Sequence, residues 1–410
     1  MHARFMPFSI GGRRDLVQSQ SGRRDTVSDM DLRPTGDQEL LRQTVREFAE
    51  SELRPHVRHW DEAQAFSPSL VGQLAAVGLT GIQIPETYGG AGMSAVEYCI
   101  AIEELARVDP SVALSVAAHN GLCVSHLYLF GSEAQKQRYL VPLARGETLG
   151  AWALTEAGAG SDAAAMRTEA RRTSDGWILS GSKQFITHGT IGGTMVAMAV
   201  TDRSKGRHGI SAFVIPRGTP GLLAGKKEDK LGMRASDTSE VIFEECRVPA
   251  DALVGLEGDA FVNTLQVLDT GRIGIAALAV GLAQGVFEAA RSYARDRRQF
   301  GQPIASFQAI QWKLADMACR IEAARLLTYR AAWLKDTGAA RTSRESSMAK
   351  LYSSESAVRA AEEGVQIHGG YGFVKDYPAE KFFRDVKLCT IGEGTSEIQR
   401  LVIARQLLGR

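Results

Sequence analysis

The chain has 410 residues, 44% of them apolar and 23% charged, as in globular proteins, which excludes disorder over the whole chain. Lys and Arg number 48 against 47 Asp and Glu, and the net charge of +1 indicates no overall attraction to nucleic acid or to an anionic membrane. No run of about 18 apolar residues occurs, so we predict a soluble protein without a membrane span, built of two or three domains or one composite unit.

Residues 1–36 are predicted to be a disordered tail, since they are rich in Gly, Arg, Ser and Gln and show little apolar periodicity. A basic N-terminus containing serine is also compatible with an organelle transit peptide. Such peptides avoid acidic residues, however, and Asp15, Asp25 and Asp29 occur here. We therefore favour the interpretation that this sequence starts too far upstream, and that the domain proper opens near Met30.

Residues 37–151 are predicted to be an N-terminal helical domain. Leu40, Val45 and Phe48 recur at helical spacing behind Asp37, a candidate N-cap. A later helix is expected to begin at Ser94, with Glu97 completing a capping box.

Residues 152–256 contain short β-branched and aromatic runs bounded by Gly, Pro and Asp: GWILSGSKQFIT, GTMVAMAVT, GISAFVIP and SEVIFEECRVP. No helix-length segment separates them, which favours an antiparallel sheet or barrel. Residues 257–410 return to long helical runs over about 259–297, 306–337, 342–368, 377–388 and 395–408, as in an antiparallel bundle. The predicted fold class is therefore α+β, mainly α.

The five cysteines are scattered and the eight histidines form no pair at metal-binding spacing. We expect reduced, buried thiols and no metal site.

Two glycine-containing segments could bring backbone close to a ligand. WALTEAGAGSD, residues 152–162, is not a GxGxxG turn between strand and helix, so a Rossmann fold is not supported. QIHGGYGF, residues 366–373, ends a helix in a glycine pair. Taken alone, the first is compatible with a plain turn and the second with a helix C-cap.

Three further segments carry candidate chemistry. GSKQFITHG, residues 181–189, ends a strand with an aromatic residue and a threonine that could pack on a flat ring. Arg297 could pair with phosphate or belong to a solvated charge run. Glu393 lies between two glycines before a helix that Thr395 or Ser396 could cap, and its carboxylate could point into a cavity or lie on the surface.

Together and in this order, these segments resemble the acyl-CoA dehydrogenase family from about residue 37 to the end, and are most similar to its short-chain (butyryl-CoA) branch. The stretches that carry the likeness are LTEAGAGSD, FIT, LDTGRIGIAA, RRQFG.PI..FQ.IQ, QIHGGYGF and IGEGTSEIQRLVIAR. The resemblance implies an N-terminal helical domain, a central antiparallel β-barrel and a C-terminal four-helix bundle. It also implies FAD bound between barrel and bundle in a homotetramer, a dimer of dimers, with part of each site supplied by a neighbouring subunit.

The resemblance also implies which residues contact FAD: Trp152, Leu154, Thr155, Gly160, Ser161, Phe185, Ile186, Thr187, Arg297, Phe300, Gln308, Gln366, Ile367, Gly369, Gly370, Thr395 and Glu397. The residues implied to contact acyl-CoA are Ser161, Asp269, Arg272 and Gly394.

By the same resemblance, Glu393 removes the α-proton of the thioester and the β-hydrogen passes as hydride to flavin N5, giving trans-2-enoyl-CoA. Desolvation by substrate would raise the pKa of Glu393 above its ordinary value of about 4.3. Some branches place the base just before the arginine of the long helix. This chain has Gly271 there, so the sequence selects Glu393. The chain departs from the usual pattern at Ala157, Phe185 and His188, where Pro, Trp and Asn are common.

The resemblance further implies an electron-transferring flavoprotein as electron acceptor and a short- or medium-length straight acyl chain. A flavin oxidase of the same fold and a non-catalytic assembly protein are the alternatives. We expect the bacterial cytoplasm, and the mitochondrial matrix as the second choice.

Overall fold

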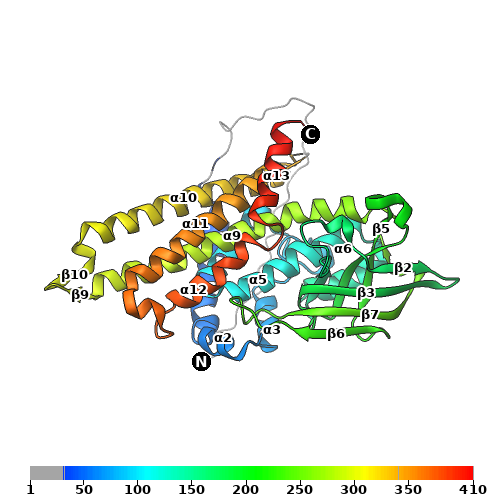
Figure 1. Ribbon diagram of the computed structural model, residues 1–410, viewed down its shortest axis with the longest axis horizontal. Coiled ribbons are helices and arrows are strands. Elements are labelled where there is room, and N and C mark those ends of the chain that lie inside the picture. The colour runs from blue at the N-terminus through cyan, green and yellow to red at the C-terminus, as the bar shows by residue number, and fades with distance from the viewer. Residues whose placement is uncertain (1–30, 32, 340, 410) are drawn as a thin grey trace.

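The computed structural model describes residues 31, 33–339 and 341–409. Helices come first, then a sheet, then long helices, as predicted. The sheet forms one end of an elongated molecule and the long helices extend to the other (Figure 1). Most of the predicted tail, residues 1–30 and 32, lies outside the described residues.

The N-terminal region is made of helices, among which α4 is almost wholly buried and packs against α1 and α5. Its elements are α1 (Gly36–Phe48), η2 (Ala49–Leu53), α2 (Val57–Ala63), α3 (Ser69–Ala76), η3 (Glu86–Tyr88), α4 (Ala95–Val108), α5 (Pro110–Ala118), η4 (His119–Val124), α6 (Ser125–Phe130), α7 (Glu133–Gln135), η5 (Lys136–Leu140) and α8 (Val141–Ala144).

Capping residues explain where two of these helices begin. The predicted capping box of Ser94 and Glu97 is confirmed at the start of α4. The predicted N-cap Asp37 is wrong, because the Thr35 side chain accepts a hydrogen bond from the Gln38 N–H and forms a capping box two residues earlier.

The central sheet is open and of mixed direction, so the predicted closed antiparallel barrel is wrong. Its strands are β1 (Gly150–Ala153), β2 (Glu169–Arg172), β3 (Gly176–Thr187), β4 (Thr194–Val200), β5 (Ile210–Pro216), β6 (Leu222–Lys227), β7 (Thr238–Pro249) and β8 (Leu253–Val254), with 3₁₀ turns η6 (Ala163–Ala165), η7 (Arg203–Gly209) and η8 (Ala250–Ala252). The order is β6-β7-β3-β2-β4-β5-β8, with β1 beside β4, and the edge strands β6 and β8 do not pair in the described part of the chain. β1 and β2 both run parallel to β4. Closure depends on strand tilt and stagger, which local residue patterns do not encode.

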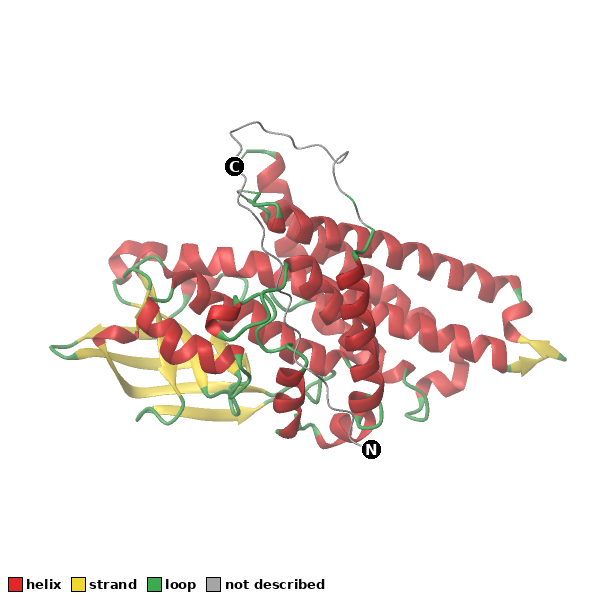
Figure 2. Cartoon of the chain, turned by 180° about the vertical axis from the view of Figure 1, so that it is seen from behind, coloured by secondary structure: helices red, strands yellow, loops and turns green. Residues whose placement is uncertain are grey.

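The C-terminal region is a bundle of long helices, as predicted. Its elements are α9 (Ala260–Asp296), β9 (Arg298–Gln299), β10 (Gln302–Pro303), η9 (Ile304–Ser306), α10 (Gln308–Asp336), α11 (Ser343–His368), η10 (Gly369–Phe373), α12 (Ala379–Asp385), η11 (Val386–Thr390) and α13 (Ser396–Leu407). α9, α10 and α11 pack on one another, and α13 packs against α11. The β9–β10 hairpin lies at the tip of the bundle farthest from the sheet (Figures 1 and 2).

The two helical regions share one hydrophobic core, in which α4 packs against α9 and α10. Glycines on α9 allow the close approach. A Cβ on Gly281 would lie 2.1 Å from the Glu103 carbonyl oxygen, and one on Gly285 2.3 Å from that of Arg107. The contact fixes α4 beside α9, the helix that carries part of the site described below.

Two helical stretches, Pro110–Phe130 and Ala260–Asp296, are long and apolar enough to cross a membrane by length and composition alone. Their most apolar windows are 83% and 78% buried inside the protein. We assign both to the core, where burial among other helices accounts for their composition.

The cysteines are all free, and Cys99, Cys123, Cys246 and Cys389 are buried as predicted. Cys319 is exposed on α10, so the prediction that every thiol is buried is wrong at this position.

Candidate functional site

Glu393 lies in the short link between η11 and α13, in an unusual backbone conformation. Its φ is +55° and that of Gly394 is +97°, so two successive residues adopt left-handed conformations. Thr395 then caps α13 by accepting a hydrogen bond from the Ile398 N–H at 3.3 Å. Left-handed φ is uncommon for a residue other than glycine and often occurs at functional sites.

Two buried donors hold this link in place. Lys350 Nζ, on α11, donates to the Gly394 carbonyl oxygen at 2.7 Å. Gln399 Nε2, on α13, donates to the carbonyl oxygens of Glu393 at 3.2 Å and Gly394 at 2.9 Å. The unusual conformation is therefore fixed from two helices.

The Glu393 side chain turns inward toward α9. Glu393 Oε2 is buried and has no hydrogen-bond partner among the described residues, although the residue as a whole is partly exposed. A Cβ on Gly271 would lie only 1.8 Å from this oxygen. Burial raises the pKa of Glu393 to about 7, against the lowering effect of Lys350 and Arg272. The site therefore holds a carboxylate that can exchange a proton near neutral pH.

Arg272 follows Gly271 on α9 and is almost fully buried. It donates to Asp269 Oδ1 at 2.7 Å, and Asp269 Oδ2 accepts from the Ser343 hydroxyl at 2.5 Å. The Arg272 Nε has no partner in the described part of the chain. The structure thus brings the predicted Asp269 and Arg272 together on the turn of α9 that also contains Gly271.

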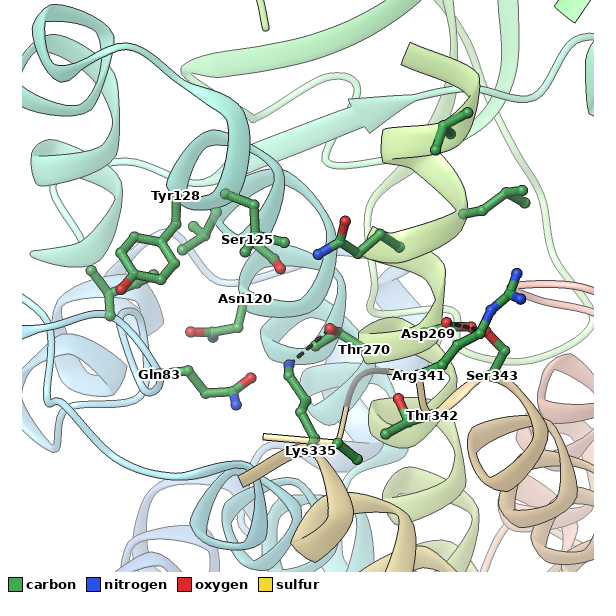
Figure 3. A pocket seen from close by; sticks show the side chains of 17 residues that line it. Gln83, Asn120, Ser125, Tyr128, Asp269, Thr270, Lys335, Arg341, Thr342 and Ser343 are labelled. Atoms are coloured by element: carbon green, nitrogen blue, oxygen red, sulfur yellow. Dashed lines mark hydrogen bonds between the residues drawn. The ribbon is translucent and has the colours of Figure 1, made fainter. Parts of the chain in front are cut away.

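A cavity of about 510 Å³ adjoins Asp269 (Figure 3). It lies between η4, α6, α9 and the segment after α10, and its lining includes Lys335, Arg341, Asn120 and Tyr128. Lys335 Nζ donates to the Thr270 hydroxyl at 2.8 Å, and burial lowers the pKa of Lys335 to about 8. Sequence reasoning missed these two cationic residues. The available signal was a pair of basic residues on either side of Gly338, between two long helices.

The predicted segment from Trp152 to Ser161 begins in β1 and continues beyond the end of this strand, and we call it the ledge. Trp152 and Leu154 are buried, Thr155 is partly exposed, and Gly160 and Ser161 are exposed. A Cβ on Gly158 or on Gly160 would meet no atom within 4 Å, and neither glycine has a left-handed φ. Neither packing nor backbone conformation within this chain requires glycine at these two positions.

A buried ion pair between Lys183 and Glu156 stabilises this ledge. Lys183 Nζ, on β3, donates to Glu156 Oε1 at 2.8 Å and to the Leu154 carbonyl oxygen at 3.1 Å. Glu156 also accepts from the backbone N–H groups of Arg167 at 2.6 Å and Thr168 at 2.9 Å. Burial raises the pKa of Glu156, but Lys183 and Thr168 outweigh it and hold the pKa below its usual value.

The end of β3 lies beside the ledge, because the Gln184 N–H donates to the Thr155 carbonyl oxygen at 2.8 Å. Phe185 has φ +59° and is 62% exposed, whereas Ile186 is buried and Thr187 is partly exposed. The next residue, His188, is buried, and its Nδ1 donates to the Gly150 carbonyl oxygen at 2.9 Å. The structure therefore brings the first two predicted FAD-contacting segments together.

The π-helical turn η4 connects the ledge with the carboxylate. A Cβ on Gly150, which begins β1, would lie 2.7 Å from Cys123 Sγ. A Cβ on Gly121 would lie 3.5 Å from Gly271 Cα. One turn of helix therefore touches both the start of β1, which leads into the ledge, and the part of α9 that Glu393 contacts.

Apart from Thr395 and Glu397, the remaining predicted FAD contacts lie at the far end of α9. A second cavity, of about 480 Å³, is lined by Tyr293, Arg297, Gln299, Ile304, Ile367, His368, Gly369, Gly370, Tyr371 and Val374. The Arg297 guanidinium lies 5.6 Å from the centre of the Tyr371 ring. Gln308 begins α10 nearby, Gln366 precedes Ile367 on α11, and Phe300 is 92% exposed in the hairpin.

Within one chain, this second group is distant from Glu393. Arg297 follows Gly271 by 26 residues along α9, which corresponds to about 39 Å of helix at ~1.5 Å per residue. Glu397 lies exposed on the first turn of α13, next to the Glu393 link. The predicted cofactor residues therefore form two groups that a single chain does not bring together.

Three family models match consecutive parts of the chain. They are acyl-CoA dehydrogenase, N-terminal domain, over residues 35–147; the middle domain over 151–246; and the C-terminal domain over 260–408. The short-chain specific acyl-CoA dehydrogenase of Clostridium acetobutylicum is 46% identical over 378 residues, covering 92% of this chain and 100% of that protein.

Two solved structures share the fold. The butyryl-CoA dehydrogenase of Megasphaera elsdenii is 42% identical with a TM-score of 0.90, covering 92% of this chain and 100% of that one. A chain in a structure described as the electron transferring flavoprotein of Acidaminococcus fermentans is 45% identical with a TM-score of 0.91, covering 93% and 100%.

Proposed function

This chain belongs to the acyl-CoA dehydrogenase family of FAD-dependent oxidoreductases, and we propose that it oxidises short, straight-chain acyl-CoA thioesters to trans-2-enoyl-CoA with Glu393 as the base. The observation that carries the proposal is the buried, unpartnered carboxylate of Glu393, whose pKa is raised to about 7. A base whose pKa lies near the working pH combines a useful ionised fraction with sufficient basicity.

An α-proton beside a thioester is only weakly acidic, so the negative charge that develops on the carbonyl oxygen has to be stabilised. We assign this task to the Glu393 N–H, which takes part in no backbone hydrogen bond within the described residues. The bonds from Lys350 and Gln399 to the carbonyls of the link keep this N–H and the carboxylate in a fixed relation. Proton removal and oxyanion stabilisation would then come from one residue.

FAD, the cofactor of the family, supplies the acceptor for the β-hydrogen as hydride. The ledge suits a flat cofactor, because Gly158 and Gly160 carry no side chains. No contact within the chain requires glycine at either position, so an external ligand accounts for them. Phe185 adds an exposed aromatic face beside it. We propose that the predicted residues from Trp152 to Ser161 and from Phe185 to Thr187 hold the flavin end, with Thr395 and Glu397 beside the Glu393 link.

We propose that the cavity beside Asp269 takes the CoA part of the substrate. Lys335 and Arg341 provide positive charge of the kind that phosphate groups attract. Ser161, Asp269, Arg272 and Gly394 remain the proposed substrate contacts. All of these except Ser161 lie on α9 or in the Glu393 link.

We propose a homotetramer in which the far group, Arg297, Phe300, Gln308 and Gln366–Gly370, completes the FAD site of a neighbouring subunit. The separation of about 39 Å along α9 supports this, since one chain cannot bring both groups to one cofactor. Exposed apolar side chains near the start of α10, Phe300 and Trp312, offer a surface for such association.

Three finer points rest on the family. We propose an electron-transferring flavoprotein as electron acceptor, a location in the bacterial cytoplasm or else the mitochondrial matrix, and domain boundaries at 37–151, 152–256 and 257–410.

An anaerobic absorbance titration of the purified protein with acyl-CoAs of increasing length tests the function. We expect a bound flavin that is bleached most completely by a short straight chain, and Glu393→Gln should abolish bleaching while FAD content and oligomeric state stay unchanged. Rapid reoxidation of the reduced enzyme by oxygen would favour the oxidase alternative. A protein that takes up no flavin would favour the assembly alternative.

A further inference from the structure

Two glycines one turn apart on α9 each lie against a polar side chain from another element. Gly271 lies against Glu393 Oε2, as described above. A Cβ on Gly274 would lie 2.4 Å from the Tyr98 hydroxyl oxygen and 3.2 Å from two ring carbons. The carboxylate and the phenol therefore contact successive turns of the same helix face.

Tyr98 is held firmly in this position. It is on α4, its side chain is 0% exposed, and its hydroxyl donates to the Ala117 carbonyl oxygen at 3.3 Å. Gly121 of η4 closes the other side, since a Cβ there would lie 3.1 Å from the same hydroxyl. A ring enclosed in this way cannot swing aside without disturbing the α4–α9 contact.

The backbone of three glycines, Gly121, Gly271 and Gly274, lies beside Glu393 and Tyr98, and Leu122 is the other side chain close to Gly271. An alkyl group beside Glu393 would lie against this backbone and against the Tyr98 side chain. Burial and the neighbouring Glu393 raise the pKa of Tyr98 well above its usual value, so the phenol stays neutral at physiological pH. The hydroxyl, which also donates to the Ala117 carbonyl oxygen, and the adjoining ring edge are the Tyr98 atoms that face Gly274 and form the surface that limits depth.

We propose that Tyr98 closes the inner end of the acyl pocket and thereby restricts the substrate to short acyl chains. This inference rests on the proposed function, in which the substrate α-carbon lies at Glu393. Gly274 follows Gly271 by three residues of α-helix, a rise of about 4.5 Å, whereas the two carbon–carbon bonds of ~1.5 Å from the α-carbon of a butyryl chain to its methyl group advance only about 2.5 Å. A butyryl chain fits this depth, whereas an octanoyl chain would have to displace the phenol.

The test compares kcat/KM for butyryl-CoA and octanoyl-CoA in the full-length FAD-loaded enzyme and its variants. Tyr98→Ala and the gentler Tyr98→Leu should raise the octanoyl-to-butyryl ratio by about 10-fold or more, since adding or removing a single methylene in an apolar pocket changes discrimination 10- to 200-fold. Ile102→Ala is the matched control, because Ile102 lies one turn along α4, is equally buried, and contacts the shared core. Its ratio should stay at the wild-type value.

An unchanged ratio in Tyr98 variants that butyryl-CoA still reduces would overturn the inference and leave the proposed function intact. An equal rise in Ile102→Ala would also overturn it, since general loosening of the core would then be the cause.

If neither Tyr98 variant retains FAD, the Gly274→Ala variant tests the inference instead, because its Cβ would displace the Tyr98 phenol into the acyl pocket. It should lower kcat/KM for butyryl-CoA relative to propionyl-CoA, and an unchanged ratio counts against the inference. A wild-type flavin that no acyl-CoA bleaches refutes the proposed function instead.

Discussion

Glu393 Oε2 occupies the space that any side chain at position 271 would need, since a Cβ on Gly271 would lie 1.8 Å away. The two positions that members of the family are expected to use for the base therefore converge on one point beside α9. A side chain at 271 and a carboxylate from 393 exclude each other. This steric relation accounts for glycine before Arg272 in this chain.

Replacing Gly271 by alanine should displace the Glu393 carboxylate. We expect the rate of flavin reduction by butyryl-CoA to fall about 100-fold, since misplacement by about 1 Å can cost that much. Overpacking should cost about 1–3 kcal/mol of stability at most, with FAD retained. Stopped-flow absorbance measures the rate.

Gly72→Ala provides the control for Gly271→Ala. Gly72 lies on an exposed turn of α3, and a Cβ there would meet no atom within 4 Å. Its activity should match the wild type. An unimpaired Gly271→Ala enzyme would show that the carboxylate does not work from the position observed here.

The pH dependence of kcat/KM should report the ionisation of Glu393. Burial raises the pKa of this carboxyl to about 7, and only the ionised form can accept the α-proton. Activity should therefore rise as pH increases through about 7 and then level off. A profile already flat from pH 5 upward would contradict the assignment of Glu393 as the base.

Lys350 should act as a positioning residue for Glu393 with an electrostatic effect of its own. Its ammonium group lowers the pKa of Glu393, and removing it in Lys350→Met should move the activity inflection above 7. Activity lost at pH 7 should return partly at higher pH. A merely structural role would lower the plateau without moving the inflection, and Lys350→Arg, which keeps the charge, should leave the inflection near 7.

Local signals in the sequence predicted local structure well. Ser94 with Glu97 predicted the start of α4, and Thr395 was one of two candidate caps for α13. The GWILSGSKQFIT run matches β3 from end to end. Such features depend on residues a few positions apart, which a single sequence displays directly.

Features that depend on distant parts of the chain were not predictable in the same way. Sheet closure was wrongly expected, because it depends on strand tilt and stagger.

The burial of two lysines was not predictable either. Lys183 and Lys350 are fully buried, whereas lysine is ordinarily at the surface. For Lys350 one hint existed, since the small residues Ser346, Ser353 and Ala357 continue its face of α11. Burial of the Glu393 carboxylate against Gly271 became visible only in three dimensions, and its catalytic role stays a prediction.

Lys183→Met should destabilise the protein and loosen the ledge. Glu156 is buried and would lose its cation, which typically costs about 3–5 kcal/mol when one partner of a buried pair is removed. Urea denaturation should show the loss, and flavin content should fall because the ledge depends on the same pair. The double variant Lys183→Met with Glu156→Gln should recover part of the stability. A double variant no more stable than the single one would mean that the ion pair is not the cause.

Gly370→Ala should weaken FAD binding without affecting the fold of the single chain. A Cβ on Gly370 would meet no atom within 4 Å, and its φ is not left-handed, so nothing inside the chain requires glycine there. Gly370 nevertheless lines the cavity with Arg297. If this cavity receives the cofactor of a neighbouring subunit, a methyl group should weaken binding about tenfold, equivalent to ~1.4 kcal/mol. Titration of the flavin-free protein with FAD measures this, with Gly72→Ala as the control. Equal affinity in Gly370→Ala and the wild type, with an unchanged oligomeric state, would place the cofactor outside this cavity.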